Sequence, residues 1–196
     1  EQISKDQHTL SALNSFVHPY NSFSEIKTSS NLLGNVTLSS KKSYNQSEIY
    51  RLNEEIKKID QEVIKGEKDP KKIITLLHDY IIKNTDYDDK ENTQNKVNTA
   101  YGSLIQGKAL CGGYTDALAV FLDYYKIPNF KVTSKEHTWN AVKINDIWYH
   151  VDLTWDDPVV PIPRIFNTYL FLTTDELLKK DDKQHNFDTK IYSEVK

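Results

Sequence analysis

Apolar residues recur at spacings of three and four between residues 47 and 66, which is the spacing of one face of an α-helix. Ser47 can cap the start of this helix, and Gly66 can end it. The apolar stripe is narrow, so we expect the helix to lie on the surface of its domain. It consists of Ile49, Leu52, Ile56, Ile59 and Val63.

Two further helices are predicted. Asp69-Pro70 supplies a cap and a first-turn proline for the second helix. Its buried face comprises Ile73, Ile74, Leu77, Tyr80 and Ile81. The third helix starts near Cys111 and is stopped by Lys126-Ile127-Pro128. Its apolar face comprises Tyr114, Ala117, Leu118, Phe121, Leu122 and Tyr125.

After Pro128 the apolar residues follow a period of two, which is typical of β-strands. Three strands are predicted, with the sequences NFKVTSK, HTWNAVKI and IWYHVDLTW. Asn145-Asp146 fits a two-residue hairpin turn between the last two strands. The tail, RIFNTYLFLTTDELLKKDD, predicts one more strand and a short helix capped by Thr173 or Thr174. Helices therefore precede an antiparallel sheet, and the predicted fold class is α+β.

The N-terminal 45 residues differ in composition from the rest of the chain. Residues 1–45 are rich in Ser, Asn, Lys and Thr, and we interpret them as an N-terminal arm or linker with one strand after Gly34-Asn35. Residues 46–196 are expected to form one domain with leading helices. Residues 84–98 form a polar loop, and we expect it to be solvated because its acidic run does not match a calcium-binding spacing.

The register of the predicted hairpin places a histidine beside an aspartate. If Ile144 pairs with Ile147, residues 137, 139 and 141 share a face with residues 148, 150, 152 and 154. His137 and Asp152 are then diagonal neighbours whose side chains can meet. The opposite face is expected to pack in the core, with Trp155 on the same side by parity. It comprises Val142, Ile144, Ile147, Tyr149, Val151 and Leu153.

Charge and cysteine content exclude several classes of protein. The 25 Lys and Arg against 28 Asp and Glu give a net charge of −3, so no basic field attracts nucleic acid. No run approaches the length of a membrane span. A single cysteine excludes an internal disulfide and a cysteine-rich zinc site. No signal peptide is visible and the chain starts at Glu1, which we interpret as a mature or trimmed form.

Cys111 is the candidate nucleophile. Taken alone, a single cysteine is more typical of a buried structural thiol. At a helix start, however, exposed N–H groups and the helix dipole favour the thiolate. Gly112 and Gly113 leave room for a substrate carbonyl, and the N–H of Cys111 or Gly112 can donate to an oxyanion. With His137 as base and Asp152 orienting it, these residues suit acyl transfer through a thioester.

Two segments, TAYGSLIQGKALCGGYTDALAVFLDYYKIP and HTWNAVKINDIWYHVDLTWDDP, resemble the transglutaminase-like superfamily of papain-type folds. The resemblance covers roughly residues 98–175 and is greatest to a bacterial branch of secreted or surface cysteine peptidases. It implies Cys111 as nucleophile, His137 as base and Asp152 as orienting acid. It implies no cofactor, no metal and no calcium dependence.

The resemblance also suggests an oxyanion-hole residue before the cysteine, for which Gln106 and Tyr101 are candidates. Gly112 departs from the family pattern, in which a charged or larger residue is common, and it should widen the mouth of the site. Gly113 and Trp139 are candidate residues of the substrate cleft.

The remaining histidines and aspartates receive structural interpretations. His150 shares a face with His137, but it lies opposite Ala141, and we expect a structural role. Asp156-Asp157-Pro158 is interpreted as a turn that ends the strand. His8, His18, His78 and His185 have no partner pattern, and we expect solvated or core positions for all four.

Three functions remain open on these residues. We expect hydrolysis of peptide or isopeptide amides first, as in a cysteine peptidase. Transamidation of protein glutamine by the same triad is the close alternative, and a non-catalytic binding module is the third. The expected partner is a protein or peptide, with a cell-surface or cell-wall component as a further candidate. We expect an extracellular or cell-surface location.

Overall fold

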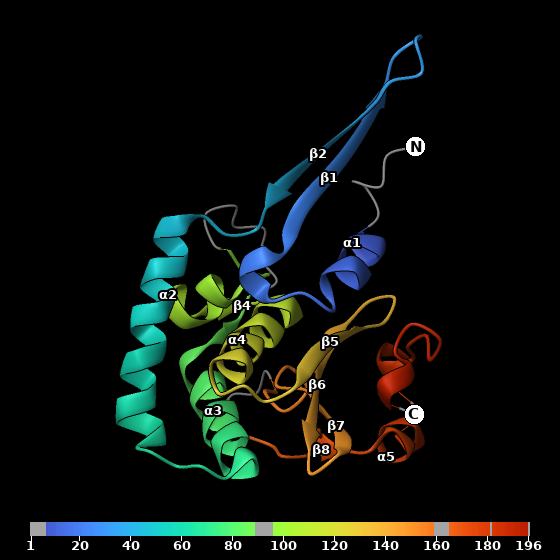
Figure 1. The fold of residues 1–196 in the computed structure, drawn as a ribbon. Helices are drawn as coiled ribbons and strands as arrows, with labels where there is room; N and C mark the ends of the chain where they lie inside the picture. The colour runs from blue at the N-terminus through green and yellow to red at the C-terminus, as the bar shows by residue number, and fades with distance from the viewer. Residues whose placement is uncertain (1–6, 89–95, 159–164, 181, 196) are drawn as a thin grey trace.

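The computed structural model describes residues 7–88, 96–158, 165–180 and 182–195. Its helices and its main antiparallel sheet form an α+β fold, with α2 and α3 on one side of the sheet and the C-terminal part of the chain on the other (Figure 1). The fold class predicted above is confirmed. Among the described residues, no helix combines the length and apolar character that crossing a bilayer requires.

Helix α2, Gln46–Ile59, starts one residue before the predicted cap. Asn45, not Ser47, is the N-cap: its Oδ1 accepts the N–H of Glu48 at 3.0 Å. The Glu48 carboxylate in turn accepts the N–H of Asn45 at 3.0 Å. This reciprocal pair satisfies two of the helix's first N–H groups, which a cap at Ser47 alone would not do. A π-helical turn, Asp60–Ile64, extends the helix toward Gly66, which has φ +81°.

Helix α3, Pro70–Asn84, and helix α4, Cys111–Tyr124, follow the prediction. Asp69 caps α3 by accepting the N–H of Lys72 at 3.0 Å. Lys126, with φ 55°, turns the chain after α4. The backbone between α3 and α4 forms the two-residue strands β3, Asp86–Tyr87, and β4, Lys108–Ala109, and a π-helical turn at residues 102–106.

The main sheet has the order β5-β6-β7-β8 and is antiparallel throughout. The hairpin pairs Ile144 with Ile147 and continues to Asn140 opposite Val151, so the predicted register is confirmed. Asn145 and Asp146 have φ of 50° and 63°, as a two-residue turn of the mirror-image type requires. The four strands are Asn129–Thr133, Thr138–Ile144, Ile147–Val151 and Leu170–Leu172.

The two faces of this sheet are both covered. One packs against α4 and shares a core with α2 and α3. It holds most of the predicted apolar set, but Ile147 is 50% exposed because it lies at the turn. The opposite face carries a second apolar cluster beneath α5, Thr174–Lys179, and residues 182–195, which we call the C-terminal segment. The side chains of that cluster are those of Phe130, Val132, Trp139, Ala141, Tyr169, Leu177, Tyr192 and Val195.

Trp155 lies in the second cluster, although strand parity predicts the other face. Strand β7 ends at Val151, and the backbone then turns through residues 153–156, so alternation no longer applies. The Trp155 ring instead contacts Tyr169, with ring centroids 5.1 Å apart.

The described part of the N-terminal 45 residues contains regular structure. Helix α1, Gln7–Asn14, lies near β5, and the N–H of Lys131 donates to the carbonyl of Ser15 at 2.9 Å. Strands β1, Phe23–Ser30, and β2, Val36–Lys42, form a hairpin that projects from the rest of the molecule (Figure 1). The strand expected after Gly34-Asn35 is therefore present as β2.

Candidate active site

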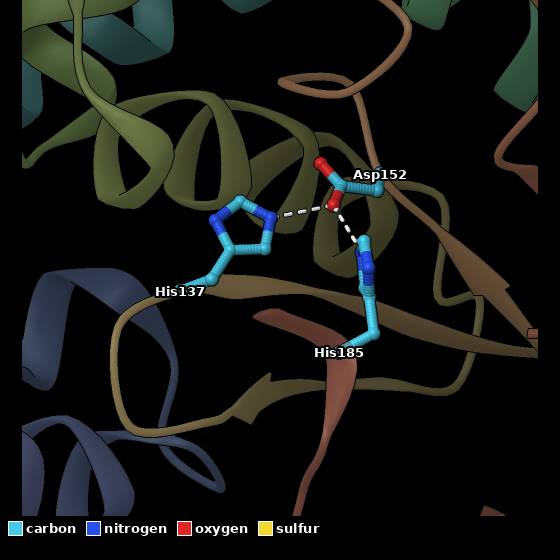
Figure 2. Close-up of side chains that lie close together, drawn as sticks. All are labelled: His137, Asp152 and His185. Atoms are coloured by element: carbon cyan, nitrogen blue, oxygen red, sulfur yellow. Dashed lines mark hydrogen bonds and ion pairs between the residues drawn. The ribbon is translucent and has the colours of Figure 1, made fainter. Parts of the chain in front are cut away.

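His137 and Asp152 meet as the hairpin register predicts. Nε2 of His137 lies 2.5 Å from Oδ2 of Asp152, and both side chains are buried (Figure 2). His137 ends the tight connection between β5 and β6, where its N–H donates to Oγ of Ser134 at 3.1 Å. The imidazole also stacks on the Trp139 ring, with centroids 5.7 Å apart and planes 18° apart. The ring is therefore held on one nitrogen and one face, which leaves Nδ1 for another partner.

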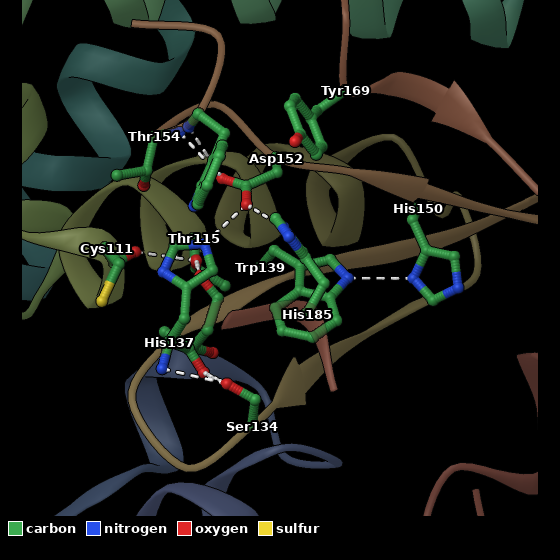
Figure 3. Close-up of polar contacts among 12 residues, drawn as sticks. Cys111, Thr115, Ser134, His137, Trp139, His150, Asp152, Thr154, Tyr169 and His185 are labelled. Carbon is green, nitrogen blue, oxygen red and sulfur yellow. Dashed lines mark hydrogen bonds and ion pairs between the residues drawn. The ribbon is translucent and has the colours of Figure 1, made fainter. Parts of the chain in front are cut away.

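Cys111 is that partner. It is the first residue of α4, it is half-buried, and it lines the same cleft as His137. Figure 3 draws its sulfur beside the His137 ring, and Cys111 is among the neighbours that raise the pKa of His137. No side chain caps this helix start, and the first N–H groups of a helix have no acceptor within it. The thiol thus lies where partial positive charge gathers.

Two polar side chains dock the first turn of α4 on β6. Oγ1 of Thr115 lies 2.7 Å from the carbonyl oxygen of Cys111 and 3.0 Å from that of Thr138, so its single O–H is shared between them. Nδ2 of Asn140 donates to the carbonyl of Thr115 at 3.0 Å. Because Thr138 directly follows His137, these bonds bring the thiol and the imidazole together.

Asp152 is 2% exposed, and both of its carboxylate oxygens accept hydrogen bonds. Oδ1 accepts the N–H groups of Thr154 at 3.0 Å and Trp155 at 3.2 Å. Oδ2 faces two imidazoles, those of His137 at 2.5 Å and His185 at 2.8 Å. A buried charge that is bonded on all sides has a single favourable orientation.

These contacts perturb the acidity of the pair. Burial acts to lower the pKa of His137, but the charge and hydrogen bond of Asp152, with a further contribution from Cys111, raise that pKa to about 10. Burial acts to raise the pKa of Asp152, but His137 and then His185 outweigh it and hold the pKa well below its usual range. The geometry therefore favours an imidazolium beside an ionised carboxylate.

His185 is a site neighbour that the sequence did not reveal. Its Nε2 bonds Asp152, and its Nδ1 lies 2.5 Å from Oδ1 of Asp182. It belongs to the C-terminal segment. Within the described residues, one isolated β-bridge, between Ser134 and Phe187, links the backbone of this segment to the chain beside β5. Its buried position agrees with the expected core position. Strand parity could not predict its bonds to Asp152 and Asp182.

The structure places both weaker cleft candidates in the interior. Trp139 is fully buried and donates its indole N–H to Nδ1 of His150 at 2.9 Å. Gly113 is buried against the preceding loop, and a Cβ there would lie 2.3 Å from the carbonyl oxygen of Val97. Gly113 therefore permits close packing and is not a cleft wall. Gly112, in contrast, lines the cleft.

The two candidate oxyanion side chains before the cysteine lie elsewhere. Oε1 of Gln106 accepts the N–H of Lys96 at 2.8 Å, and the hydroxyl of Tyr101 accepts from Arg51 at 2.5 Å. Neither residue lines the cleft. Asn98 does line it, and a Cβ at position 112 would lie 3.0 Å from its Oδ1. Its loop position carries no periodic signal by which the sequence could indicate it.

The expected structural role of His150 agrees with its contacts. Its Nδ1 accepts from Trp139, and its Nε2 lies 3.0 Å from Oγ1 of Thr174. Burial, with the nearby charge of His185, lowers the pKa of His150 to about 4, so its ring is neutral at neutral pH.

Asp156 and Asp157 do more than end a strand. Oδ1 of Asp156 accepts the N–H groups of Thr168 at 2.8 Å and Tyr169 at 3.0 Å, and Oδ2 lies 3.2 Å from Nε2 of His78. Asp157 accepts from the hydroxyl of Tyr114 at 2.5 Å. The predicted turn is present, but the carboxylates bond distant groups and not the local backbone, so the aspartates join α3, α4 and the chain before β8.

One group in the described part of the chain has metal-ligand spacing. The ligand atoms of His137, Asp152 and His185 lie within 4.8 Å of one another. The two short imidazole–carboxylate hydrogen bonds already use these atoms, and a cation would have to replace both.

Comparison with known proteins places this site in a family. The family model of the transglutaminase-like superfamily matches residues 57–153. This part of the chain, just under half of it, belongs to the superfamily, which is typically enzymatic. No functionally curated protein matches the sequence.

The solved structures similar to this chain include two whose names state an activity. One, "Crystal structure of a TGase", has a TM-score of 0.50 and 12% identity over 84% of this chain and 51% of its own. The other, "a Putative Cysteine Protease from Cytophaga hutchinsonii", has a TM-score of 0.41 and 15% identity over 66% of this chain and 61% of its own. The present chain thus spans about half the length of the TGase, and the likeness shows the fold alone.

Proposed function

We propose that this chain is a cysteine peptidase that hydrolyses peptide or isopeptide amides with Cys111, His137 and Asp152. One observation carries the proposal: His137 lies between a thiol at a helix start and a buried carboxylate that accepts its other ring N–H. Acyl transfer needs this order of nucleophile, base and orienting acid.

The contacts suggest a sequence of steps. Cys111 gives its proton to Nδ1 of His137, and the thiolate–imidazolium pair is stabilised by Asp152. The thiolate attacks the amide carbon, and Nδ1 returns the proton to the leaving amine as the C–N bond breaks. Water, deprotonated by the same nitrogen, then attacks the thioester, releases the acid and restores the thiol.

The oxyanion formed in each half-reaction needs donors beside the sulfur. The N–H groups of Cys111 and Gly112 lie at the open helix start. The side-chain amide of Asn98 lies against Gly112 in the cleft and is the nearest side-chain candidate. We therefore assign it the position that the sequence suggested for Gln106 or Tyr101.

The cleft suits a peptide chain. Its volume is about 720 Å³, and its walls include the base of the β1–β2 hairpin, the loop at residues 96–99 and the connection at residues 133–138. Asp116 and Lys131, which also line it, form an ion pair at 2.8 Å. Ser, Thr and Asn side chains, which can hydrogen-bond a peptide backbone, outnumber the other charged residues of the lining. Those charged residues are mainly basic: Lys41, Lys42, Lys96, Lys135 and Glu136.

Mass spectrometry of a digested proteome incubated with the protein tests this proposal. We expect new peptide termini with the wild-type chain and none with Cys111→Ala, which should fold normally. The same incubation with a primary amine separates the chemistries: incorporation of the amine into glutamine, without new termini, would overturn hydrolysis in favour of transamidation. Neither product from the folded wild-type chain would overturn both reactions and leave a binding module.

A further inference from the structure

We propose that His185 is a positioning residue that holds Asp152 through the same carboxylate oxygen that faces His137, so that the C-terminal segment forms part of the catalytic apparatus. The inference rests on the proposed function of Cys111, His137 and Asp152. It begins from one juxtaposition: a single carboxylate oxygen, Oδ2 of Asp152, faces two imidazoles at 2.5 and 2.8 Å (Figure 2).

Hydrogen-bond chemistry decides where the hydrogens lie. An ionised carboxylate only accepts, so each ring nitrogen that faces one must donate. His185 faces Asp152 through Nε2 and Asp182 through Nδ1, at 2.8 and 2.5 Å. Between two carboxylates each of its nitrogens is placed to donate, and a ring that donates from both carries a positive charge. It places a positive charge one hydrogen bond from Asp152, which favours the ionised carboxylate that His137 needs.

The surroundings of His185 fix its ring. The side chain is 1% exposed. Tyr169 stacks on it with centroids 5.0 Å apart and planes 17° apart, while Trp139 and Trp155 contact it edge-on at 4.8 and 5.2 Å. With both nitrogens bonded and the ring enclosed, His185 has little freedom to release Asp152.

The segment that carries His185 is anchored beside the strand connection that carries His137. The hydroxyl of Tyr192 bonds Oγ of Ser15 at 2.8 Å and accepts the N–H of Thr133 at 3.0 Å. Phe187 bridges Ser134, which in turn accepts the N–H of His137. The same segment thus reaches both ends of the imidazole–carboxylate pair.

This contact lies outside the region shared with the family. The family model ends at residue 153, and His185 follows it by 32 residues. A truncation at the family boundary would keep the three proposed catalytic residues and remove the second imidazole.

Kinetics can separate positioning from packing. His185→Phe keeps a flat ring but removes both donors, and loss of a charge-assisted bond to Asp152 should lower kcat by about 10- to 100-fold with KM little changed. His185→Gln, whose amide can donate to Asp152, should recover most of this loss. Tyr192→Phe is the matched control, because it removes buried hydrogen bonds of the same segment without touching Asp152.

A substrate-free readout keeps this inference separate from the proposed function. Alkylation of Cys111 by iodoacetamide near pH 6.5 should be several-fold slower in His185→Phe than in the wild type, Tyr192→Phe or His185→Gln. Absent turnover by the wild-type chain would refute the peptidase assignment, whereas this difference in alkylation would still support positioning. Wild-type kcat and alkylation in folded His185→Phe would overturn the inference, as would an equal loss in Tyr192→Phe. If His185→Phe does not fold, Asp182→Asn decides, because it removes the second carboxylate that holds the His185 ring: wild-type kcat and alkylation in that variant overturn the inference.

Discussion

Replacing Asp152 by asparagine tests how His137 is controlled. The change preserves shape, and an amide oxygen can still accept the backbone N–H groups of Thr154 and Trp155. The amide nitrogen then faces the N–H groups of His137 and His185, so two charge-assisted bonds are lost and donor faces donor. We expect slower turnover because the imidazolium loses its counter-charge and its orientation.

The size of the effect follows from the acidity of His137. Moving its pKa from the ordinary 6.5 to about 10 corresponds to about 5 kcal/mol of preference for the imidazolium. Asp152 supplies the larger part of the favourable interaction and Cys111 the remainder. We therefore expect kcat to fall by about 10³-fold in Asp152→Asn, which is a smaller loss than removal of the nucleophile causes.

Asp156→Asn provides a matched control for this experiment. Asp156 is also a buried carboxylate that accepts two backbone N–H groups on one oxygen and faces an imidazole with the other. It does not line the cleft. Both variants should lose stability in urea denaturation, but only Asp152→Asn should lose kcat per folded molecule. A folded Asp152→Asn variant with a kcat within about threefold of the wild type would refute this account of the imidazole.

Three further outcomes are expected. The folded-state pKa of His137 is raised to about 10, so its pairing with Asp152 stabilises the fold fully below about pH 6.5. This stabilisation is lost as the pH rises through about 10. The midpoint of urea denaturation should therefore fall between about pH 6 and about pH 10.5, and a flat profile would contradict the pairing. Gly113→Ala should lower the free energy of unfolding by about 1–3 kcal/mol, because its Cβ would lie 2.3 Å from a backbone carbonyl oxygen. Gly112→Ala should change the urea midpoint little, because its Cβ would lie 3.0 Å from a side chain that can move. Equal midpoints for the two variants would contradict this difference. Phe121→Ala, in the fully buried core, should cost about 3–5 kcal/mol in urea denaturation, and a loss below 1 kcal/mol would show that the site repacks.

The sequence by itself determined the local elements and one side of the site. The period of three to four predicts α3 and α4, and the period of two predicts the β6–β7 hairpin. Asn145-Asp146 sets the register of that hairpin, and register alone places His137 and Asp152 on one face. These features depend on neighbours in the chain, which is why periodicity and turn chemistry suffice to predict them.

Only the tertiary structure decided what surrounds this pair. The bonds of Thr115 to Thr138 bring the start of α4 to β6 across 23 residues, and no local pattern encodes that distance. Trp155 leaves the parity of its strand because the strand ends before it. His185 reaches Asp152 from a segment with little regular pairing, 33 residues further along the chain. Contacts of this kind depend on how whole elements pack. The local sequence does not select them, because each of these side chains could meet many other partners.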